Sequence, residues 1–433
     1  MRVAVTSLFV LLFSFSSCRT DCHSKNAGLV PATPADSPVV CPVIIPADPH
    51  ETERARCTFG PGATAEETLG VPASLAQQIP IRHVIVVMRE NRSFDHLLGT
   101  APASFTNRDP AGKVVAPFHA KTTCLKSNAP HQWDGMHAGV NDGAMDGFVK
   151  NAAKWTFTDG HFAMSFYDAT DLPFEHWLVN TWASSDRHFA SVRSGTIPNR
   201  DFMLLATNDG VRGTGAGIPN ASTPTLFDAL DAAGLTWGAY SDSEILSGAL
   251  GWNTDSPGCY CERDLFERID TGTLPNVVFV DATPAVNDDH PPADLQRGEA
   301  WVRELYQHVI ASPQWARTAM IWTYDEGGGF ADHVPPPNQA CVARPGTVDD
   351  AYFELGVRVP FVVVSPYARP GLVSHVPQEH TAVTRFIETI FGLPALTARD
   401  ANSPALLDLF DFSCAPPMLV PPPAPEAGTG GCD

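Results

Sequence analysis

The chain has 433 residues, of which 44% are hydrophobic and 18% are charged, a composition typical of a globular protein with a sizeable core. Its formal net charge is -20, from 48 acidic and 28 basic side chains. This balance excludes a general nucleic-acid binder, because such proteins present a broad basic surface to the phosphate backbone. It does not exclude the binding of small anionic ligands, since a bound divalent cation reverses the charge of a local site.

The N-terminal residues 1–18 predict a secretory signal peptide. Arg2 precedes an apolar run from Val3 to Phe15, and small residues follow before Cys18. The run is shorter than the roughly 20 residues of a transmembrane helix, and no other segment is suited to span a bilayer. The end of this segment also resembles a bacterial lipoprotein cleavage box with Cys18 as the lipidated residue, although Phe15 stands where leucine is usual. We therefore expect an exported protein that is secreted, periplasmic or lipid-anchored at the cell envelope; a buried N-terminal strand or helix is the alternative.

Ten cysteines are scattered along the chain without a repeated C-x-x-C pattern. This spacing favours disulfides formed in an oxidising compartment over a zinc cluster. Cys259 and Cys261 form a single C-x-C, which is a weak metal motif. The sequence leaves the disulfide pairing open.

Residues 19–78 are rich in Pro, Ala and Asp and have no sustained hydrophobic period, which predicts a tether or a loosely packed lead-in. Short apolar runs rich in β-branched residues then predict buried strands, at 81–88, 235–240, 277–280, 319–324 and 361–364. Helical patterns lie between or after them, at 225–233, 300–310 and 381–391. This alternation predicts an α/β globular domain at 79–413, with a mostly parallel central sheet and helices on both faces. Residues 414–433 are rich in Pro and Gly and predict a poorly ordered tail.

Polar clusters follow two of the predicted strands. Glu90 and Asn91 come directly after the first strand, and the adjacent acids Asp325 and Glu326 follow the fourth. In a parallel sheet the carboxyl ends of the strands form the functional edge. Two neighbouring carboxylates repel each other, and a shared cation explains them most simply, although a plain acidic loop is the structural alternative. Three glycines follow Glu326 and allow close backbone approach.

Thr196 is the third feature. Gly195 and Thr196 precede Pro198 and a helical stretch, so Thr196 is expected at about the N-cap of a helix. The N–H groups and the dipole of a helix N-terminus favour an anion such as phosphate. By itself, this pattern also fits an ordinary threonine cap.

These segments, in this order, resemble the bacterial and fungal phosphoesterase family, which includes phospholipases C and acid phosphatases and has an alkaline-phosphatase-like fold. The hallmarks are ENRSFDHLLG from Glu90, TIPNR from Thr196 and TYDEGGGFADHVPPP from Thr323. Two further stretches fit the family, at 128–148 and 288–302, and 356–366 with 379–392 match its closing strand and helix. The resemblance covers residues 81–393, and its ordered motifs are far more specific together than any one of them.

The resemblance implies roles for individual side chains. A divalent metal ion of unknown identity would be held by four of them: Glu90, Asn91, Asp325 and Glu326. Thr196 matches the family's Ser/Thr nucleophile, and His290 matches a histidine suited to protonate the leaving oxygen. His137 matches a second, phosphate-contacting histidine, with His131 as an alternative that the sequence leaves open. Asp332 and His333 are candidates for orienting the ligands.

Two positions depart from the family pattern. Gly327 stands where a histidine often follows the Asp-Glu pair, so any role of that ring is absent or supplied elsewhere. Glu379 stands where the family usually has Asp before His-Thr, and we interpret Glu379, His380 and Thr381 mainly as helix-start residues. Neither departure touches the implied ligands or the nucleophile.

The implied reaction is a double displacement on a small-molecule or phospholipid phosphoester. Thr196 attacks phosphorus, the alcohol leaves with a proton from His290, and water cleaves the phosphothreonine. A phospholipid substrate would involve contact with a membrane surface, for which the aromatic candidates are Trp133, Phe174, Trp177 and Trp252. The alternative of a different class is a non-catalytic, metal-stabilised surface or binding protein that retains the fold. A sulfatase is less favoured, because the chain has no C-x-P-x-R or S-x-P-x-R motif.

Overall fold

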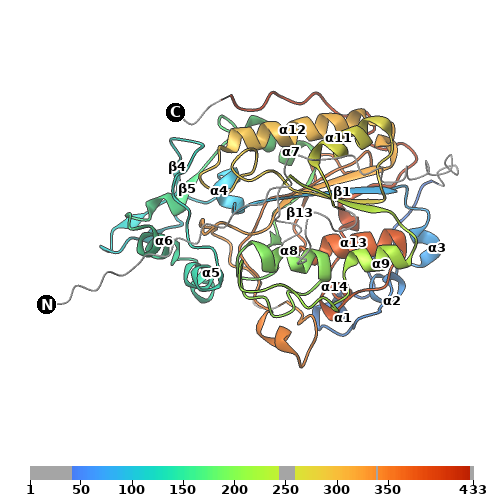
Figure 1. Ribbon diagram of the computed structural model, residues 1–433, viewed down its shortest axis with the longest axis horizontal. Coiled ribbons are helices and arrows are strands. Elements are labelled where there is room, and N and C mark those ends of the chain that lie inside the picture. The colour runs from blue at the N-terminus through green and yellow to red at the C-terminus, as the bar shows by residue number, and fades with distance from the viewer. Residues whose placement is uncertain (1–40, 243–258, 338–339, 430–433) are drawn as a thin grey trace, which may run out of the picture.

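The computed structural model describes residues 41–242, 259–337 and 340–429 (Figure 1). The predicted signal peptide and Trp252 lie outside these residues. No helix in the described part of the chain is long and apolar enough to cross a membrane.

Within the described residues, eight strands form the central sheet, in the spatial order β13-β6-β12-β11-β1-β10-β8-β9. In that order their bounds are Val373–Ser374, Ala183–Ser185, Phe361–Val364, Thr318–Tyr324, His83–Arg89, Val277–Val280, Trp237–Tyr240 and Cys259–Tyr260. All neighbouring pairs are parallel except those of β12, which runs antiparallel to β11 and β6. The predicted α/β class with a mostly parallel sheet is therefore confirmed.

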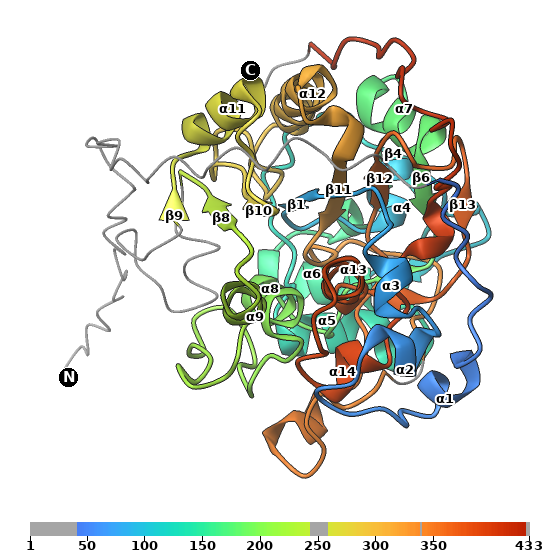
Figure 2. The ribbon, with the colours of Figure 1, turned by 90° about the vertical axis from the view of Figure 1, so that its right-hand side faces the viewer.

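Helices cover both faces of this sheet, as Figures 1 and 2 show. One face carries α7 (Pro173–Thr181), α11 (Glu262–Thr271) and α12 (Leu295–Ala311); the other carries α8 (Thr196–Leu205), α9 (Leu226–Ala232) and α13 (Thr381–Phe391). Strands β1, β10, β11 and β12 are buried along their whole lengths, which explains why the sequence gives them continuous apolar runs rather than alternation.

Shorter elements complete the described fold. The short helices are α1 (Glu51–Ala55), α2 (Ala65–Leu69), α3 (Ala73–Ala76), α4 (Phe94–Leu98), α5 (Trp133–Val140), α6 (Phe148–Thr156) and α14 (Ala398–Ala401). The strands of small two-stranded sheets are β2 (Asn107–Arg108) with β3 (Val114–Val115), β4 (Phe118–His119) with β5 (Ser165–Phe166), and β7 (His188–Phe189) with β14 (Gln378–Glu379).

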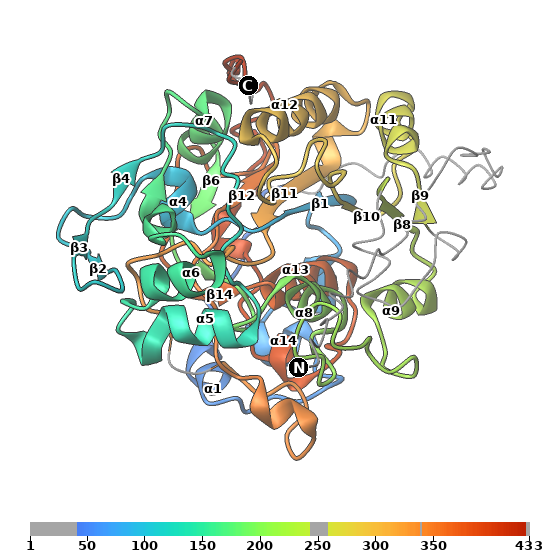
Figure 3. The ribbon, with the colours of Figure 1, turned by 60° about the vertical axis from the view of Figure 1, so that its left-hand side comes forward.

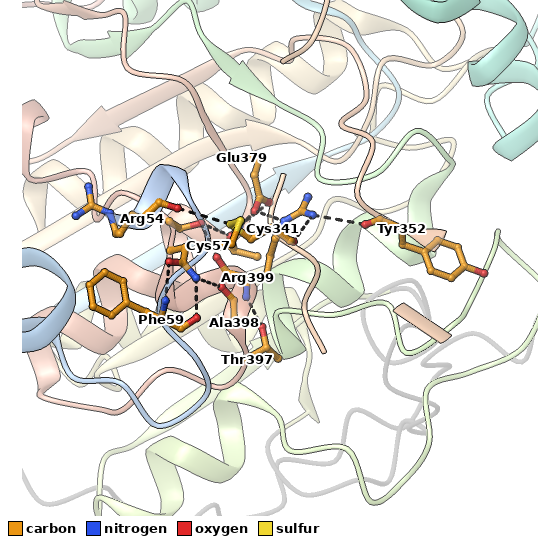
Figure 4. The surroundings of a disulfide bond; sticks show 12 residues. Arg54, Cys57, Phe59, Cys341, Tyr352, Glu379, Thr397, Ala398 and Arg399 are labelled. Atoms are coloured by element: carbon orange, nitrogen blue, oxygen red, sulfur yellow. Dashed lines mark hydrogen bonds and ion pairs between the residues drawn. A yellow bond between two sulfur atoms is a disulfide. The ribbon is translucent and has the colours of Figure 1, made fainter. Parts of the chain in front are cut away.

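The described part of the lead-in, residues 41–78, is packed rather than a loose tether. Helices α1 to α3 lie in it, and Leu69, Val71 and Ala76 form a small buried cluster with Ala405. Disulfides join Cys57 to Cys341 and Cys41 to Cys414, so this segment is covalently tied to distant parts of the chain. Figure 4 shows the first of these beside a network of polar contacts. The sequence shows no periodic pattern here, because tertiary contacts and disulfides, rather than a hydrophobic period, hold the segment in place.

The tail is also held down as far as residue 429. The Gly428 amide donates to Glu299 Oε2 at 2.6 Å, and Arg303 Nε donates to the Pro425 carbonyl at 2.7 Å. Both partners lie on α12, so the tail runs across that helix (Figure 1). Pro425 and Gly428 of the predicted poorly ordered tail are therefore held by contacts with α12.

A side lobe, residues 107–164, projects from the carboxyl ends of the strands and contains β2 to β4, α5 and α6 (Figure 3). It has a small core of its own, which includes Met136, Val140, Phe148, Val149 and Met164. The Asn151 side chain on α6 donates to the Gly135 carbonyl on α5 at 2.8 Å, so the two helices are joined by a polar contact as well.

Candidate active site

The two predicted ligand pairs lie side by side at the carboxyl edge of the sheet. Strands β1 and β11 are parallel neighbours, and Arg89 pairs in register with Tyr324, the last residue of β11. Glu90 and Asn91 therefore leave β1 where Asp325 and Glu326 leave β11. The Asn91 amide donates to Asp325 Oδ1 at 3.0 Å, and all four side chains are buried. The structure thus brings these four residues together.

One buried arginine neutralises part of this acidic cluster. Arg200 Nη2 donates to Glu90 Oε1 at 2.9 Å, and Arg200 Nη1 donates to Asp281 Oδ1. Arg200 Nε lies 3.7 Å from Asp325 Oδ2. Burial alone would lower the pKa of Arg200, but these three carboxylates raise it, so the guanidinium stays charged. Arg200 ends the TIPNR motif, and this role is one that the sequence interpretation did not assign.

Thr196 is the first residue of α8, with Gly195 as the N-cap, one position away from the predicted cap. Its hydroxyl donates to Glu90 Oε2 at 3.3 Å. The side chain is buried, with 8% of its surface exposed. The hydroxyl is therefore oriented by a carboxylate at a helix N-terminus, where the peptide dipoles favour an anion.

The glycines after Glu326 bring neighbouring loops into contact. Gly328 has φ +63°, and a Cβ there would lie 2.2 Å from the Asn91 carbonyl oxygen. Gly329 has φ +71°, and its Cβ would lie 2.7 Å from Ala129 Cβ. The sequence predicted that backbone approaches closely at these glycines. In the structure Gly328 approaches the loop that carries Asn91, and Gly329 approaches the loop that carries Ala129 and His131.

His290 is placed by its neighbour Asp289, which is held by residues next to the candidate ligands. Arg89 donates to Asp289 at 2.6 and 3.1 Å, and the Tyr324 hydroxyl donates to Asp289 Oδ2 at 2.6 Å. His290 Nδ1 donates to the Pro291 carbonyl at 2.7 Å, which leaves Nε2 for proton exchange. The 288–290 turn is thus fixed to the ends of β1 and β11.

Of the two rival histidines, His131 is the one that lies beside His290. Their ring centroids are 5.6 Å apart in an edge-to-face arrangement. His131 Nδ1 donates to the Ala129 carbonyl at 2.8 Å, and burial lowers the pKa of His131 to about 4. His131 therefore stays neutral at physiological pH and is suited to hydrogen bonding rather than to proton donation.

His137 occupies a different setting. It lies on α5, where Nδ1 donates to the Trp133 carbonyl at 2.7 Å and Nε2 lies 3.0 Å from Glu354 Oε2. Glu354 also pairs with Arg193 Nη1 at 3.0 Å. These described contacts of His137 involve neither Thr196 nor the candidate metal ligands.

Asp332 and His333 belong to a buried ion-pair cluster beside the site. Arg358 donates to Asp332 Oδ1 at 2.9 Å and to Asp95 Oδ1 at 2.9 Å. His333 Nδ1 lies 2.7 Å from Asp95 Oδ2. Asp95, Asp332 and His333 are close enough together to hold a metal ion, but the Arg358 guanidinium already bonds both carboxylates. We name this set, with Arg358, the Arg358 cluster; it joins the loop after β1 to the loop after β11.

Two further residues support the ligand loop from behind. His380 Nε2 donates to the Asp325 carbonyl at 2.8 Å, and His188 Nε2 lies 3.3 Å from His380 Nδ1. Burial lowers the pKa of His380 to about 4, which keeps this ring neutral. Glu379 accepts the Thr381 amide at 3.0 Å, as expected of a helix-start residue, and it also pairs with Arg399 Nε at 2.9 Å (Figure 4). The sequence interpretation missed the contact of His380 because 55 residues separate the partners.

The chemistry of the site fits a divalent cation. Asn91 Oδ1 and Glu326 Oε1 are buried oxygens without a hydrogen-bond partner among the described residues. Burial, and then the Glu90 charge, raises the pKa of Asp325 well above its usual range. Burial, and then Asp325, does the same for Glu326. Three carboxylates, those of Glu90, Asp281 and Asp325, face the Arg200 guanidinium, and Glu326 adds a fourth beside Asp325. A hard cation with oxygen ligands would neutralise the excess charge.

Of the four aromatic candidates for a lipid-facing rim, the three in the described residues pack within the protein. Phe174 is fully buried in the main core, and Trp177 packs against the same core. Trp133 lies over His137, with the ring centroids 4.2 Å apart. These three side chains serve packing among the described residues.

Comparisons with known proteins identify the family. Residues 81–394 match the Phosphoesterase family. The chain is 31% identical over 382 residues to a non-specific phospholipase C4 of Arabidopsis thaliana, covering 74% of this chain and 70% of that protein. It is 30% identical over 435 residues to phospholipase C B of Mycobacterium tuberculosis, covering 82% of each.

Solved structures give more distant matches. One is a protein in the alkaline phosphatase superfamily from Vibrio parahaemolyticus, with 9% identity, a TM-score of 0.38 and coverage of 75% of this chain and 69% of that chain. The family match spans most of the described sheet and all the residues of the candidate site, from Glu90 to His380. The chain therefore belongs to the phosphoesterase family and is a hydrolase that acts on phosphoester bonds.

Proposed function

We propose that this protein is a metal-dependent phosphoesterase of the phospholipase C type that works through Thr196 and a phosphothreonine intermediate. The observation that carries the proposal is the contact of the Thr196 hydroxyl with Glu90 at a helix N-terminus, within a buried cluster of oxygen ligands. Threonine is a weak nucleophile, and this setting supplies both an anion site and a carboxylate for its proton. The phospholipases C among the relatives favour a phospholipid over a small monoester, with an acid phosphatase as the second candidate.

The side chains would divide the work as follows. Glu90, Asn91, Asp325 and Glu326 would hold the cation, which supplies Lewis-acid stabilisation of charge on the phosphoryl oxygens. The Thr196 oxygen attacks phosphorus and its proton passes to Glu90. The bond from phosphorus to the alcohol oxygen breaks, and that oxygen takes a proton from His290.

The second half of the reaction reverses these roles. His290, now neutral, accepts a proton from water as the water oxygen attacks phosphorus. The bond from phosphorus to Thr196 breaks, and the Thr196 oxygen recovers its proton from Glu90. His131, neutral and beside His290, would hydrogen-bond a phosphoryl oxygen. Its contact with the His290 ring supports His131 over His137 for this role.

Export is part of the proposal. The disulfides between Cys57 and Cys341 and between Cys41 and Cys414 support folding in an oxidising compartment. Cell fractionation with labelling by palmitate distinguishes a lipid-anchored from a freely secreted form. A cytosolic protein with reduced thiols would contradict both.

A substrate panel tests the proposal. The rates of hydrolysis of phosphatidylcholine, sphingomyelin and p-nitrophenyl phosphate are measured. Each is measured with the wild-type protein, with Thr196→Ala and with wild-type protein treated with a chelator. We expect hydrolysis of phosphatidylcholine, with loss of activity in both the variant and the chelated protein and recovery on addition of a divalent cation. Turnover of the monoester alone would support the acid phosphatase, and no turnover of any ester would favour a non-catalytic binding protein.

The role of His290 needs a separate arm. His290→Ala should slow esters of poorly leaving alcohols far more than nitrophenyl esters, because only the former require a proton on the leaving oxygen. Asn128→Ala is the matched control, since its amide lies 3.4 Å from His290 Nε2 but is far too weak an acid to protonate a leaving oxygen. Equal losses on both ester types would assign His290 to binding or structure.

A further inference from the structure

Within the described residues, the lysines are confined to one part of the molecule. The sequence has six, at 25, 113, 121, 126, 150 and 154, and five of them lie in the side lobe. All five of these side chains are exposed. The side lobe carries six basic and five acidic side chains, whereas the whole chain has a net charge of -20. The lobe is therefore a positively biased surface on a strongly negative protein.

Two large exposed aromatic side chains lie in the same lobe. Trp155 on the last turn of α6 is 60% exposed, and Phe157, directly after the helix, is 94% exposed. Phe157 is the most exposed of the large hydrophobic side chains in the described residues. The Lys154 ammonium lies 5.9 Å from the centroid of the Trp155 ring. We name Lys150, Lys154, Trp155 and Phe157 the α6 patch.

The fold has no need of a phenylalanine at position 157. Its backbone has φ +56°, the left-handed conformation of a helix C-cap that glycine adopts most easily. A side chain that is almost fully exposed adds no packing to compensate for this strain. Packing within the chain therefore does not account for a phenylalanine at this position.

The α6 patch is rigidly connected to the mouth of the candidate site. Helix α6 is bonded to α5 through Asn151 and Gly135. Helix α5 begins at Trp133, two residues after His131, and the same loop brings Asn128 to 3.4 Å from His290. Lys126 precedes Asn128 by two residues, so the basic surface continues toward the site.

We propose that the α6 patch is a docking surface for an anionic lipid bilayer, which presents the candidate site to its substrate. Tryptophan and phenylalanine partition into the interfacial region of a bilayer, and lysines next to them are attracted by anionic headgroups. Because the remainder of the chain is acidic, an anionic surface repels the other faces and selects the side lobe. The purpose of this surface rests on the proposed phospholipid substrate, although docking is measurable without turnover.

The test is sedimentation of the full chain, made inactive by Thr196→Ala, with vesicles of phosphatidylcholine and phosphatidylglycerol in equal parts. We expect Phe157→Gly to weaken vesicle binding about tenfold or more, since the variant lacks the aromatic side chain that the bilayer would bury. Its melting temperature should not fall, because glycine relieves the strain at this position. Lys154→Glu should weaken binding to these vesicles but leave the weaker binding to pure phosphatidylcholine unchanged.

Matched controls separate the patch from general effects. Arg263→Glu makes the same change in net charge on α11, where the side chain is 73% exposed, and Val420→Ser removes an apolar side chain that is 86% exposed on the tail. Both should bind vesicles like the parent protein. Unchanged vesicle affinity of Phe157→Gly and Lys154→Glu, or equal losses in the controls, would overturn the docking surface. Binding to soluble polyglutamate but not to vesicles would also overturn the proposal, and would indicate that the α6 patch binds an acidic protein instead.

The outcome is separable from that of the proposed function. In the protein with Thr196 intact, Phe157→Gly should hydrolyse a water-soluble short-chain substrate at the normal rate and vesicle lipid more slowly. Vesicle binding that requires the patch, without hydrolysis of any phospholipid, would refute the proposed substrate but keep the docking surface.

Discussion

Single buried side chains set the chemistry of this site, and His131 illustrates how burial fixes a protonation state. The ring is 8% exposed and its pKa is about 4, compared with 6.5 for an ordinary histidine. As pH falls through 6.5, the unfolded chain binds a proton at this position before the folded chain does. His131 therefore lowers stability progressively between pH 6.5 and about 4.

We predict that His131→Asn removes this part of the acid sensitivity. Between about pH 7.5 and 5, the wild-type free energy of unfolding should fall by about 2 kcal/mol more than that of the variant, from linkage alone. Urea unfolding at the two pH values measures the difference. Parallel slopes for His131→Asn and wild type would show that the ring is not held neutral.

The residues of the site were predictable from sequence to different degrees. The positions after strands β1 and β11 pointed to Glu90, Asn91, Asp325 and Glu326, because parallel strand ends share one edge. The roles of Arg200, His380 and Asp281 were not predicted, since their contacts join residues far apart in the chain. The sequence also left His131 and His137 as alternatives, because no pattern determined that α5 begins between them, at Trp133.

At the scale of elements, the loops after β1 and β11 are locked together by the Arg358 cluster. Arg358 lies three residues before β12 and is 4% exposed, with its guanidinium bonded to Asp95 and Asp332. Asp95 belongs to the loop and helix that follow Asn91, and Asp332 belongs to the loop that follows Glu326. The cluster is therefore a positioning device for the two pairs of candidate ligands.

We predict that Arg358→Met destabilises the protein by about 3–5 kcal/mol, because two buried carboxylates lose their partner. It should also weaken the affinity for a divalent cation measured by calorimetry, with partial recovery in Arg358→Lys. Arg344→Met is the control, because Arg344 pairs with Asp209 and Asp349 in another cluster. That variant should be destabilised but keep the affinity of the parent for the cation. Equal cation affinity in both variants would limit Arg358 to a structural role.

The elements themselves were largely readable from the sequence. Each of the five predicted strands overlaps an observed strand of the sheet, and the three predicted helices correspond to α9, α12 and α13. The sheet strands β6, β9 and β13 have only two or three residues, too few for a pattern to emerge. The antiparallel direction of β12 and the packing of residues 41–78 are tertiary properties, and local sequence carries no information about them.

At the scale of the whole molecule, burial makes the acidic site sensitive to both pH and cations. The pKa values of Asp325 and Glu326 are raised, so protons and a divalent cation compete for the same carboxylates. Without a cation, these groups bind protons more tightly in the folded than in the unfolded chain, and they stabilise the fold as pH falls. Protons therefore neutralise the site mainly at low pH, and a divalent cation neutralises it mainly at high pH.

We predict that a divalent cation raises the melting temperature more at about pH 8 than at about pH 6, because fewer protons compete at the higher pH. Thermal unfolding of chelator-treated protein, with Mg²⁺, Ca²⁺, Mn²⁺ or Zn²⁺ added separately, measures the shift and ranks the metals. Asp325→Asn should abolish most of the shift. A shift that is independent of pH, or that survives in Asp325→Asn, would place the cation elsewhere.

The central claim is that Thr196 carries the phosphoryl group during turnover, and acid quenching with peptide mass analysis tests it most directly. The protein is mixed with phosphatidylcholine, quenched in acid within a turnover and digested. We predict phosphate on the peptide that contains Thr196, on the corresponding serine peptide of the active Thr196→Ser variant, and on no peptide of Thr196→Ala. Near-normal hydrolysis by Thr196→Ala, or phosphate on another residue of the wild-type protein, would contradict the account.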